Sequence, residues 1–163
     1  MKTDSTKLLQ DLGAFVLADS HEPLCVRRAA EMIRAERGYR WVGIYKVTRG
    51  ECVIIAGTGD EPPTYPRFPM TQGLCGAVVE SGETLVVPDV KKDPRYLPTF
   101  WTTRSEIVVP IAHEGKQCVC GILDVESDKT DAFTEDDQDF LEHAAVLLAQ
   151  AICVPKKHDA PAD

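Results

Sequence analysis

Positive charge, long apolar runs and patterned cysteines are all scarce in this sequence. Its 163 residues include 18 Lys and Arg against 26 Asp and Glu, which gives a net charge of −8. Nucleic acids and anionic membranes are bound by basic surfaces, so we expect neither as a partner. No apolar run approaches the roughly 20 residues of a membrane-spanning helix, and no apolar stretch of a secretory signal follows Met1. These absences predict a cytoplasmic protein.

The cysteines lack the spacing of a metal site. No pair forms a Cys-x-x-Cys motif, and none lies at a ligand spacing from a histidine. Because nothing supplies four zinc ligands at a usual spacing, we expect no metal and no other cofactor. Thiols stay reduced in the cytoplasm, and a free cysteine in an apolar run is most often an inert core residue. The cysteines are Cys25, Cys52, Cys75, Cys118, Cys120 and Cys153.

Hydrophobic periodicity predicts one α+β domain, with an antiparallel sheet and helices packed on one side. Apolar residues at helical spacing, with cap residues at the ends, predict helices over 5–17, 21–37, 73–82 and 134–153. Strands are predicted over 39–47, 52–56, 84–87, 107–111 and 118–125. Proline-rich connections are predicted over 57–69 and 88–104, and the length of the second is typical of a functional lid or wall.

Three carboxylates interrupt the apolar strands on either side of a predicted turn at Glu114-Gly115-Lys116. Glu106 opens the first strand, while Asp124 and Glu126 lie at the end of the second. Since Asp124 and Glu126 are two residues apart in a strand, they point to the same face of the sheet. Buried carboxylates are unfavourable unless something binds them, so the joint occurrence of these three predicts a small charged pocket.

Each candidate residue also has a purely structural interpretation. Taken singly, Glu106 or Asp124 is more simply a strand-end residue that accepts backbone N–H groups. Trp41 and Tyr45 are four apart in a predicted strand and share a face, where aromatic residues are more often core than ligand contacts. Cys75, which precedes a glycine, is most often the kind of small buried residue that permits close helix packing.

Four motifs together resemble the GAF domain, a sensory and ligand-binding module of the PAS-like superfamily. They are Gly73-Leu-Cys-Gly76, Val87-Pro-Asp-Val90, Gly121-Ile-Leu-Asp-Val125 and Phe133-Thr-Glu-Asp-Asp137. The resemblance covers roughly Leu24 to Cys153. It implies a single GAF domain over 1–154, with an N-terminal helix within 1–20. The polar composition of 155–163 separately predicts a disordered tail. The resemblance implies a fold rather than an activity, because this fold supports many functions.

A narrower resemblance is to the stand-alone free methionine-(R)-sulfoxide reductases. It rests on Trp41-Val-Gly-Ile-Tyr45, Gly73-Leu-Cys-Gly76, Ser105-Glu-Ile-Val108 and Leu123-Asp-Val-Glu-Ser127. The resemblance implies that Trp41 and Tyr45 wall a pocket. It also implies that Glu106, Asp124 and Glu126 hold the ligand's ammonium and the sulfoxide oxygen, with Glu126 where the family usually has Asp. Cys75 matches one of the family's redox cysteines and is the candidate catalytic residue.

Two other redox cysteines of that family have no counterpart here. The resemblance puts Thr99 at or near the position of the catalytic cysteine and Tyr65 at the position of a further one. Reducing a sulfoxide needs a thiolate nucleophile, an acid and a second thiol. A clustered carboxyl with a raised pKa would supply the acid, and a helix N-terminus would lower the pKa of Cys75. Cys118 and Cys120 share the strand parity of the pocket residues, so relocated thiols are conceivable.

Three functions are therefore open. The first is a GAF module that binds an amino acid or amine, because a carboxylate-rich pocket would repel a nucleotide phosphate. The second is an active reductase that uses Cys75 with Cys118 or Cys120. The third is a dimeric regulatory domain with a vestigial pocket. Apolar stripes within 8–16 and 140–152 are candidates for a homodimer interface, and any signal would pass to a separate protein.

Overall fold

The fold combines helices with a single sheet, as the α+β prediction requires. The computed structural model describes residues 4–18, 23–113 and 118–153. Its helices are α1 (Thr6–Ala18), α2 (Pro23–Arg37), α3 (Gly73–Ser81) and α4 (Glu135–Ile152), with a short 3-10 helix, η1 (Val90–Lys92). Its strands are β1 (Trp41–Thr48), β2 (Glu51–Gly57), β3 (Arg67–Pro69), β4 (Leu85–Val87), β5 (Ser105–Ala112) and β6 (Val119–Ser127). Within these residues, no helix is long and apolar enough to traverse a lipid bilayer.

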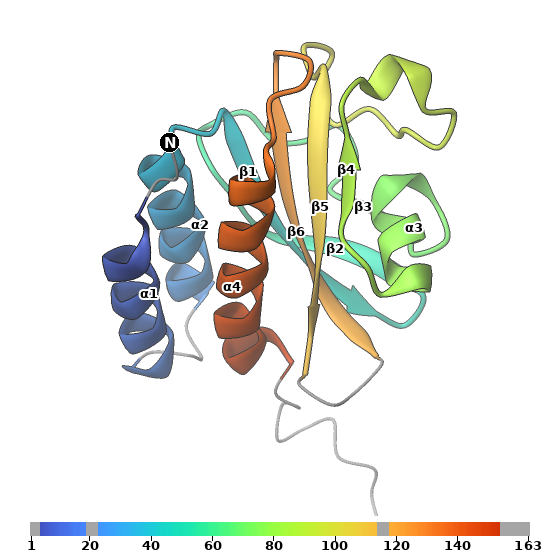
Figure 1. Ribbon diagram of the computed structural model, residues 1–163. Helices are drawn as coiled ribbons and strands as arrows, with labels where there is room; N and C mark the ends of the chain where they lie inside the picture. The colour runs from blue at the N-terminus through green and yellow to red at the C-terminus, as the bar shows by residue number, and fades with distance from the viewer. Residues whose placement is uncertain (1–3, 19–22, 114–117, 154–163) are drawn as a thin grey trace, which may run out of the picture.

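The strands form one antiparallel sheet in the order β3-β2-β1-β6-β5-β4. Figure 1 shows α1, α2 and α4 together on one side of this sheet and α3 on the other. The predicted sheet with its N- and C-terminal helices packed on one side is confirmed. The opposite face is left to α3 and to the two proline-rich connections, and this is where the candidate residues lie.

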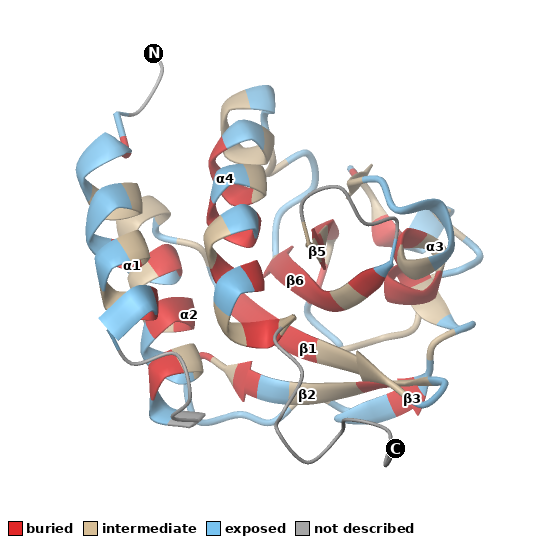
Figure 2. Ribbon diagram, turned by 90° about the horizontal axis from the view of Figure 1, so that it is seen from below, coloured by how far each residue is buried: buried red, intermediate tan, exposed pale blue. Residues whose placement is uncertain are grey.

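Side chains along the central strands alternate between two apolar clusters, one on each face of the sheet. On β1, Val42 and Ile44 pack in the cluster beneath the helices, whereas Trp41 and Tyr45 belong to the cluster beneath α3. The helix α4 turns a buried face toward the sheet (Figure 2). Because β1 is buried on both faces, the polar groups near Trp41 and Tyr45 are shielded from water.

Local signals set the ends of two helices as predicted. Gly38 has a φ of +65° directly after α2, a left-handed conformation that glycine adopts at little cost. Thr134 caps α4, because its side chain accepts from the Asp137 N–H while the Asp137 side chain accepts from the Thr134 N–H. The predicted turn at Glu114-Gly115-Lys116 and the tail over 155–163 lie outside the described residues.

Two local predictions were incomplete, and a third, the homodimer interface, stays a prediction. The connection 57–69 contains β3, which at three residues is too short to show a period, and the connection 88–104 contains η1. Within the apolar stripes at 8–16 and 140–152, Leu12 and Leu148 are at most 1% exposed and pack inside this chain, whereas Leu8, Leu9 and Leu147 are only partly buried. The homodimer, with these stripes as its interface, stays a prediction.

Replacing Leu148 by alanine should lower the free energy of unfolding by about 2–5 kcal/mol, because the change leaves a cavity between α4 and the sheet. Val146→Ala is the matched control: Val146 is on the same helix but 61% exposed, and its change should stay within about 0.5 kcal/mol. Urea unfolding of both variants measures the difference. Equal losses in the two variants would mean that α4 does not pack as described.

Candidate ligand-binding site

Three carboxylates lie together on the sheet face that α3 covers. β5 positions Glu106, β6 positions Asp124 and Glu126, and Glu106 stands directly opposite Glu126 across the two strands. These residues are 3%, 1% and 1% exposed, respectively. Like charges directly opposite one another destabilise an antiparallel pair. The arrangement therefore lowers the stability of the empty protein unless something neutralises it.

The hydrogen-bond donors around these carboxylates are too few. Thr103 donates its hydroxyl to Glu126 Oε2 at 3.0 Å. When ionised, Glu106 Oε2, Asp124 Oδ1 and Glu126 Oε1 have no donor among the residues that the structure describes. The strand-end interpretation, in which backbone N–H groups satisfy them, therefore fails for these oxygens. Each unsatisfied buried oxygen costs on the order of 1–3 kcal/mol or more, so the site is incomplete without a proton or a bound group.

Protons relieve part of this cost. Burial, and then the charges of Asp124 and Glu126, raise the pKa of Glu106 well above its ordinary value. Burial raises the pKa of Asp124 to about 7. Burial and the charge of Asp124 raise the pKa of Glu126 to about 8. Hydrogen bonds with Asp124 and Glu126 raise the pKa of Glu106 further and lower those of its two neighbours, so the three groups share protons. The cluster therefore retains at least one proton near neutral pH, as the clustering of the carboxylates predicted.

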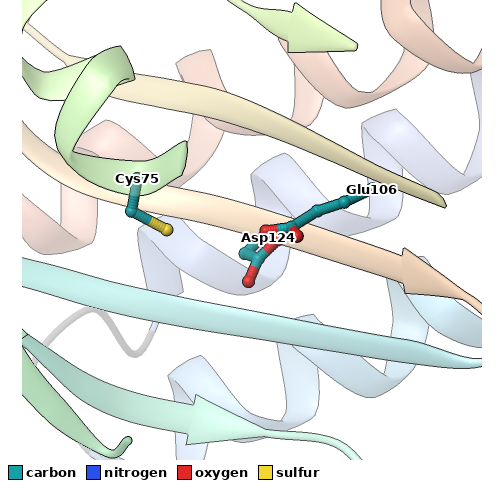
Figure 3. Close-up of side chains that lie close together, drawn as sticks. All are labelled: Cys75, Glu106 and Asp124. Carbon is teal, nitrogen blue, oxygen red and sulfur yellow. The ribbon is translucent and has the colours of Figure 1, made fainter. Parts of the chain in front are cut away.

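Cys75 points its sulfur at the same cluster from the first turn of α3 (Figure 3). Its Sγ and one carboxylate oxygen each from Glu106 and Asp124 all lie within 4.8 Å of one another. Burial, followed by the charges of Asp124 and Glu106, raises the pKa of Cys75 well above its usual range. The predicted lowering of this pKa by the helix N-terminus is wrong, because burial and two nearby carboxylates outweigh the helix dipole. Cys75 is a thiol rather than a thiolate.

Aromatic rings wall the site on its β1 side. Trp41 pairs with Glu126 across β1 and β6. Its ring lies over Gly43, where a Cβ atom would come within 2.1 Å of the indole, so only glycine fits beneath it. The Trp41 ring packs edge-on against Phe100 with ring centroids 5.2 Å apart. Trp41 and Tyr45 are thus core residues that also neighbour the carboxylates. The sequence had left open whether they were core residues or ligand contacts, and their positions are compatible with both.

Two loops roof a small cavity above the carboxylates. Its volume is about 20 Å³, enough for about one water molecule or ion. Tyr65 and Thr99 line it together with Cys75. Thr64 joins the two loops, because its N–H and its hydroxyl donate to the Thr99 carbonyl oxygen at 3.0 and 2.8 Å. The three positions that the family resemblance matched to redox cysteines therefore converge on one cavity.

The other thiols are poorly placed to act with Cys75. A register shift at the end of the β5–β6 pairing makes Cys120 an extra residue in β6, which reverses its side. The prediction that Cys120 faces the pocket is therefore wrong: it packs with the helix-side core, where its sulfur contacts that of Cys153. Cys52 lies on the pocket face, but burial raises its pKa to about 11. Cys118 is exposed, and its role in a relocated pair stays a prediction.

Several residues around the site were not predicted from the sequence. Phe68, which packs edge-on against Tyr45, lies in the short strand β3. Leu97 lines the cavity from the connection whose length had indicated a wall. No local pattern marks Thr103, although it donates to Glu126. Of the aromatic residues in that connection, Trp101 is 91% exposed and takes no part in the wall.

Comparison with known families agrees with this architecture. The GAF domain family matches residues 24–152, from the start of α2 to the end of α4. The chain is a GAF-domain protein. The match includes all six strands and the helix that carries Cys75, so the whole candidate site lies within the GAF domain.

Relatives of this GAF domain include a GAF domain-containing protein and free methionine-R-sulfoxide reductases. It is 30% identical over 142 residues to GAF domain-containing protein A of Dictyostelium discoideum, with 86% of this chain and 87% of that protein covered. It is 34% identical over 119 residues to the free methionine-R-sulfoxide reductase of Saccharomyces cerevisiae, covering 71% and 64% of the two chains. The solved free methionine-R-sulfoxide reductase of Neisseria meningitidis, in complex with its substrate, superposes with a TM-score of 0.80 at 27% identity, covering 93% and 92%.

The raised carboxyl pKa values predict that the empty GAF domain loses stability as the pH rises. An acid whose pKa is higher in the folded state contributes stability below its unfolded pKa and loses it as the pH passes through the folded pKa. For Asp124 and Glu126, the pH range over which stability is lost begins at about pH 4 and ends at the folded pKa values of about 7 and about 8. Urea unfolding in EDTA, without amines, should show the free energy of unfolding falling from pH 5 to pH 8.

The free energy of unfolding of the Asp124→Asn variant should fall less from pH 5 to pH 8 than that of the parent protein. The variant should be more stable than the parent at pH 8, because it removes one of the buried charges. Glu80→Gln, an exposed carboxylate on α3, is the control and should follow the parent protein. Stability that is flat or rises from pH 5 to pH 8 would contradict the raised pKa values.

Proposed function

We propose that this GAF domain binds a small cationic or zwitterionic molecule, an amino acid or an amine, in the cavity between α3 and the sheet. The observation that carries the proposal is the set of three buried carboxylates, each with an oxygen that has no donor among the described residues. An ammonium group supplies three N–H donors and a positive charge. It would therefore supply both the hydrogen-bond donors and the positive charge that the empty site lacks.

The lining of the cavity supports a cation over an anion. Glu106 and Asp124 stand at its floor, and no Lys, Arg or His is among the described residues that line it. A phosphate or a nucleotide would be repelled by these carboxylates and would find no basic side chain to offset the repulsion. Tyr45 lines the cavity together with Glu106 and Asp124, and an aromatic ring beside the carboxylates favours a cation further.

The size of the cavity supports an opening of the roof on binding. About 20 Å³ accommodates an ammonium group but not the remainder of an amino acid. The contact between Thr64 and Thr99 is the hydrogen-bonded link between the two roofing loops. We infer that this link separates when a ligand larger than an ion enters, while the ammonium stays with the carboxylates.

A second candidate function is reduction of free methionine-R-sulfoxide with relocated cysteines. It is favoured by the similarity to reductases of that name and by the place of Cys75 in the cavity. Against it stand the raised pKa of Cys75 and the position of Cys120 on the other face of the sheet. Thr99, at the position compared with the catalytic cysteine, carries a hydroxyl that cannot form the disulfide of a thiol mechanism. We therefore place binding before reduction.

A thermal-shift screen of amino acids and amines tests the binding proposal. At least one compound should raise the melting temperature, and Asp124→Asn should abolish the rise because it removes a charge from the floor of the cavity. Glu80→Gln should respond like the parent protein, since it changes an exposed carboxylate on the same helix as Cys75. No shift with any amine or amino acid would leave the third alternative, a dimeric regulatory domain with a vestigial pocket.

Turnover of racemic free methionine sulfoxide, coupled to thioredoxin and scored for each epimer, tests the second candidate. We expect no loss of either epimer, because no thiolate lies in the cavity at neutral pH. Loss of the R epimer that disappears in Cys75→Ser but persists in Cys118→Ser would make Cys75 the nucleophile. That result would overturn our ordering of the two functions.

A further inference from the structure

The geometry points to a divalent metal ion with affinity for both sulfur and oxygen, such as Zn²⁺, as the cation that this cavity binds. Its ligands would be Cys75 Sγ and the carboxylates of Glu106 and Asp124. The inference rests on the proposed function in one respect, because it takes the same buried carboxylates as a site for a cation, but it names a metal ion in place of an amine. It departs from our expectation of no metal, which considered only the spacing of ligands along the chain.

The three donors come from different elements that the fold brings together. Cys75 lies in the first turn of α3, Glu106 on β5 and Asp124 on β6, and their side chains converge in Figure 3. Their donor atoms all lie within 4.8 Å of one another. Zinc binds sulfur at about 2.3 Å and carboxylate oxygen at about 2.0–2.2 Å, so the donors of one tetrahedral ion are roughly 3.5 Å apart. The donors would therefore have to move about 1 Å closer to one another to bind one ion.

The oxygens at this point are buried and lack donors. Glu106 and Asp124 are 3% and 1% exposed, and Glu106 Oε2 and Asp124 Oδ1 have no donor within the described part of the chain. Buried carboxylates in proteins are paired, hydrogen-bonded or bound to metal. A divalent ion would coordinate both carboxylates and the thiolate and would cancel two of their three negative charges.

The sulfur favours a metal over an ammonium group. A thiol is a weak hydrogen-bond acceptor and adds little to the binding of an N–H donor. A thiolate is one of the strongest protein ligands for zinc, and metal coordination deprotonates the thiol. Cys75 is thus of little use to an amine and of direct use to a metal.

The space available fits a single ion. The cavity of about 20 Å³ holds about one water molecule or ion. Three protein ligands and one open position is the coordination of catalytic zinc sites, whereas structural sites are closed by four protein ligands. The open position would face the loops that carry Tyr65 and Thr99, through which a further ligand reaches the ion.

A cobalt titration tests the inference on the full chain after treatment with EDTA and removal of the chelator. Co²⁺ reports on thiolate coordination through a near-ultraviolet charge-transfer band and on tetrahedral geometry through visible bands. We expect both bands to saturate at one equivalent in the parent protein. Cys75→Ser should lose the charge-transfer band, and Cys118→Ser, which changes an exposed thiol, should keep it.

Two further variants test the site independently of Cys75→Ser, which would also lose the band if it misfolded. Glu106→Gln and Asp124→Asn keep every cysteine and remove one buried carboxyl ligand each, and each should weaken Co²⁺ binding at least tenfold while the circular dichroism spectrum stays that of the parent. Zn²⁺ should displace Co²⁺ and raise the melting temperature of the parent protein but not of Asp124→Asn.

The outcomes separate this inference from the proposed function. A charge-transfer band that persists in Cys75→Ser, or no band in the parent protein, would overturn the metal site. If amines or amino acids then still raised the melting temperature, the proposed function would stand without the metal. If neither metals nor amines shifted it, both would fall.

Discussion

Three carboxyl groups buried side by side are the constraint on which the rest of this molecule depends. Glu106, Asp124 and Glu126 lie on β5 and β6, which form the longest strand pairing of the sheet, and are nearly inaccessible to water. Removing ionised groups from water is among the largest costs in a folded protein. Such a cluster persists only because a proton or a bound cation neutralises it, and that requirement connects the fold to the proposed binding of a cation.

The surrounding structure keeps water away from this cluster and leaves a defined space beside it. The helices α1, α2 and α4 cover one face of the sheet, so the opposite face is free to hold polar groups beneath α3 and two loops (Figure 1). Gly43 lets the ring of Trp41 lie flat along the sheet, and the Thr64–Thr99 link holds the roofing loops together. The same elements that isolate the carboxylates also raise the pKa of Cys75, which is why a thiol at a redox position of the family is unsuited to nucleophilic attack here.

The fold was predictable from the sequence because its signals are local or periodic. The cap at Thr134 and the glycine at Gly38 each specify a helix end through the conformation of a few residues. The alternation on β6 correctly placed Asp124 and Glu126 on one face, but the same rule failed for Cys120, because an extra residue in the strand reverses the sides of its neighbours. A bulge of this kind leaves no mark in the pattern of apolar residues.

The site was predictable in its members but not in its electrostatics. Family motifs identified Trp41, Tyr45, Cys75 and the three carboxylates, and the fold brings all of them to one face. The convergence of Cys75 with Glu106 and Asp124 depends on how α3 docks on the sheet, which is a tertiary contact that ligand spacing along the chain does not encode. The direction of the Cys75 pKa shift depends on the same contact.

Infrared spectroscopy of the carboxyl groups tests the central claim most directly, because only an unusual carboxyl stays protonated at neutral pH. The protein treated with EDTA and free of amines should show a protonated-carboxyl stretch at pH 7, assignable to the cluster by its change in Glu106→Gln. Saturation with a bound cation should remove this band, since the cation takes the place of the proton. A protein with no protonated carboxyl at pH 7 in the empty state would contradict the account, because the cluster would then be neutralised by something other than a proton or a cation.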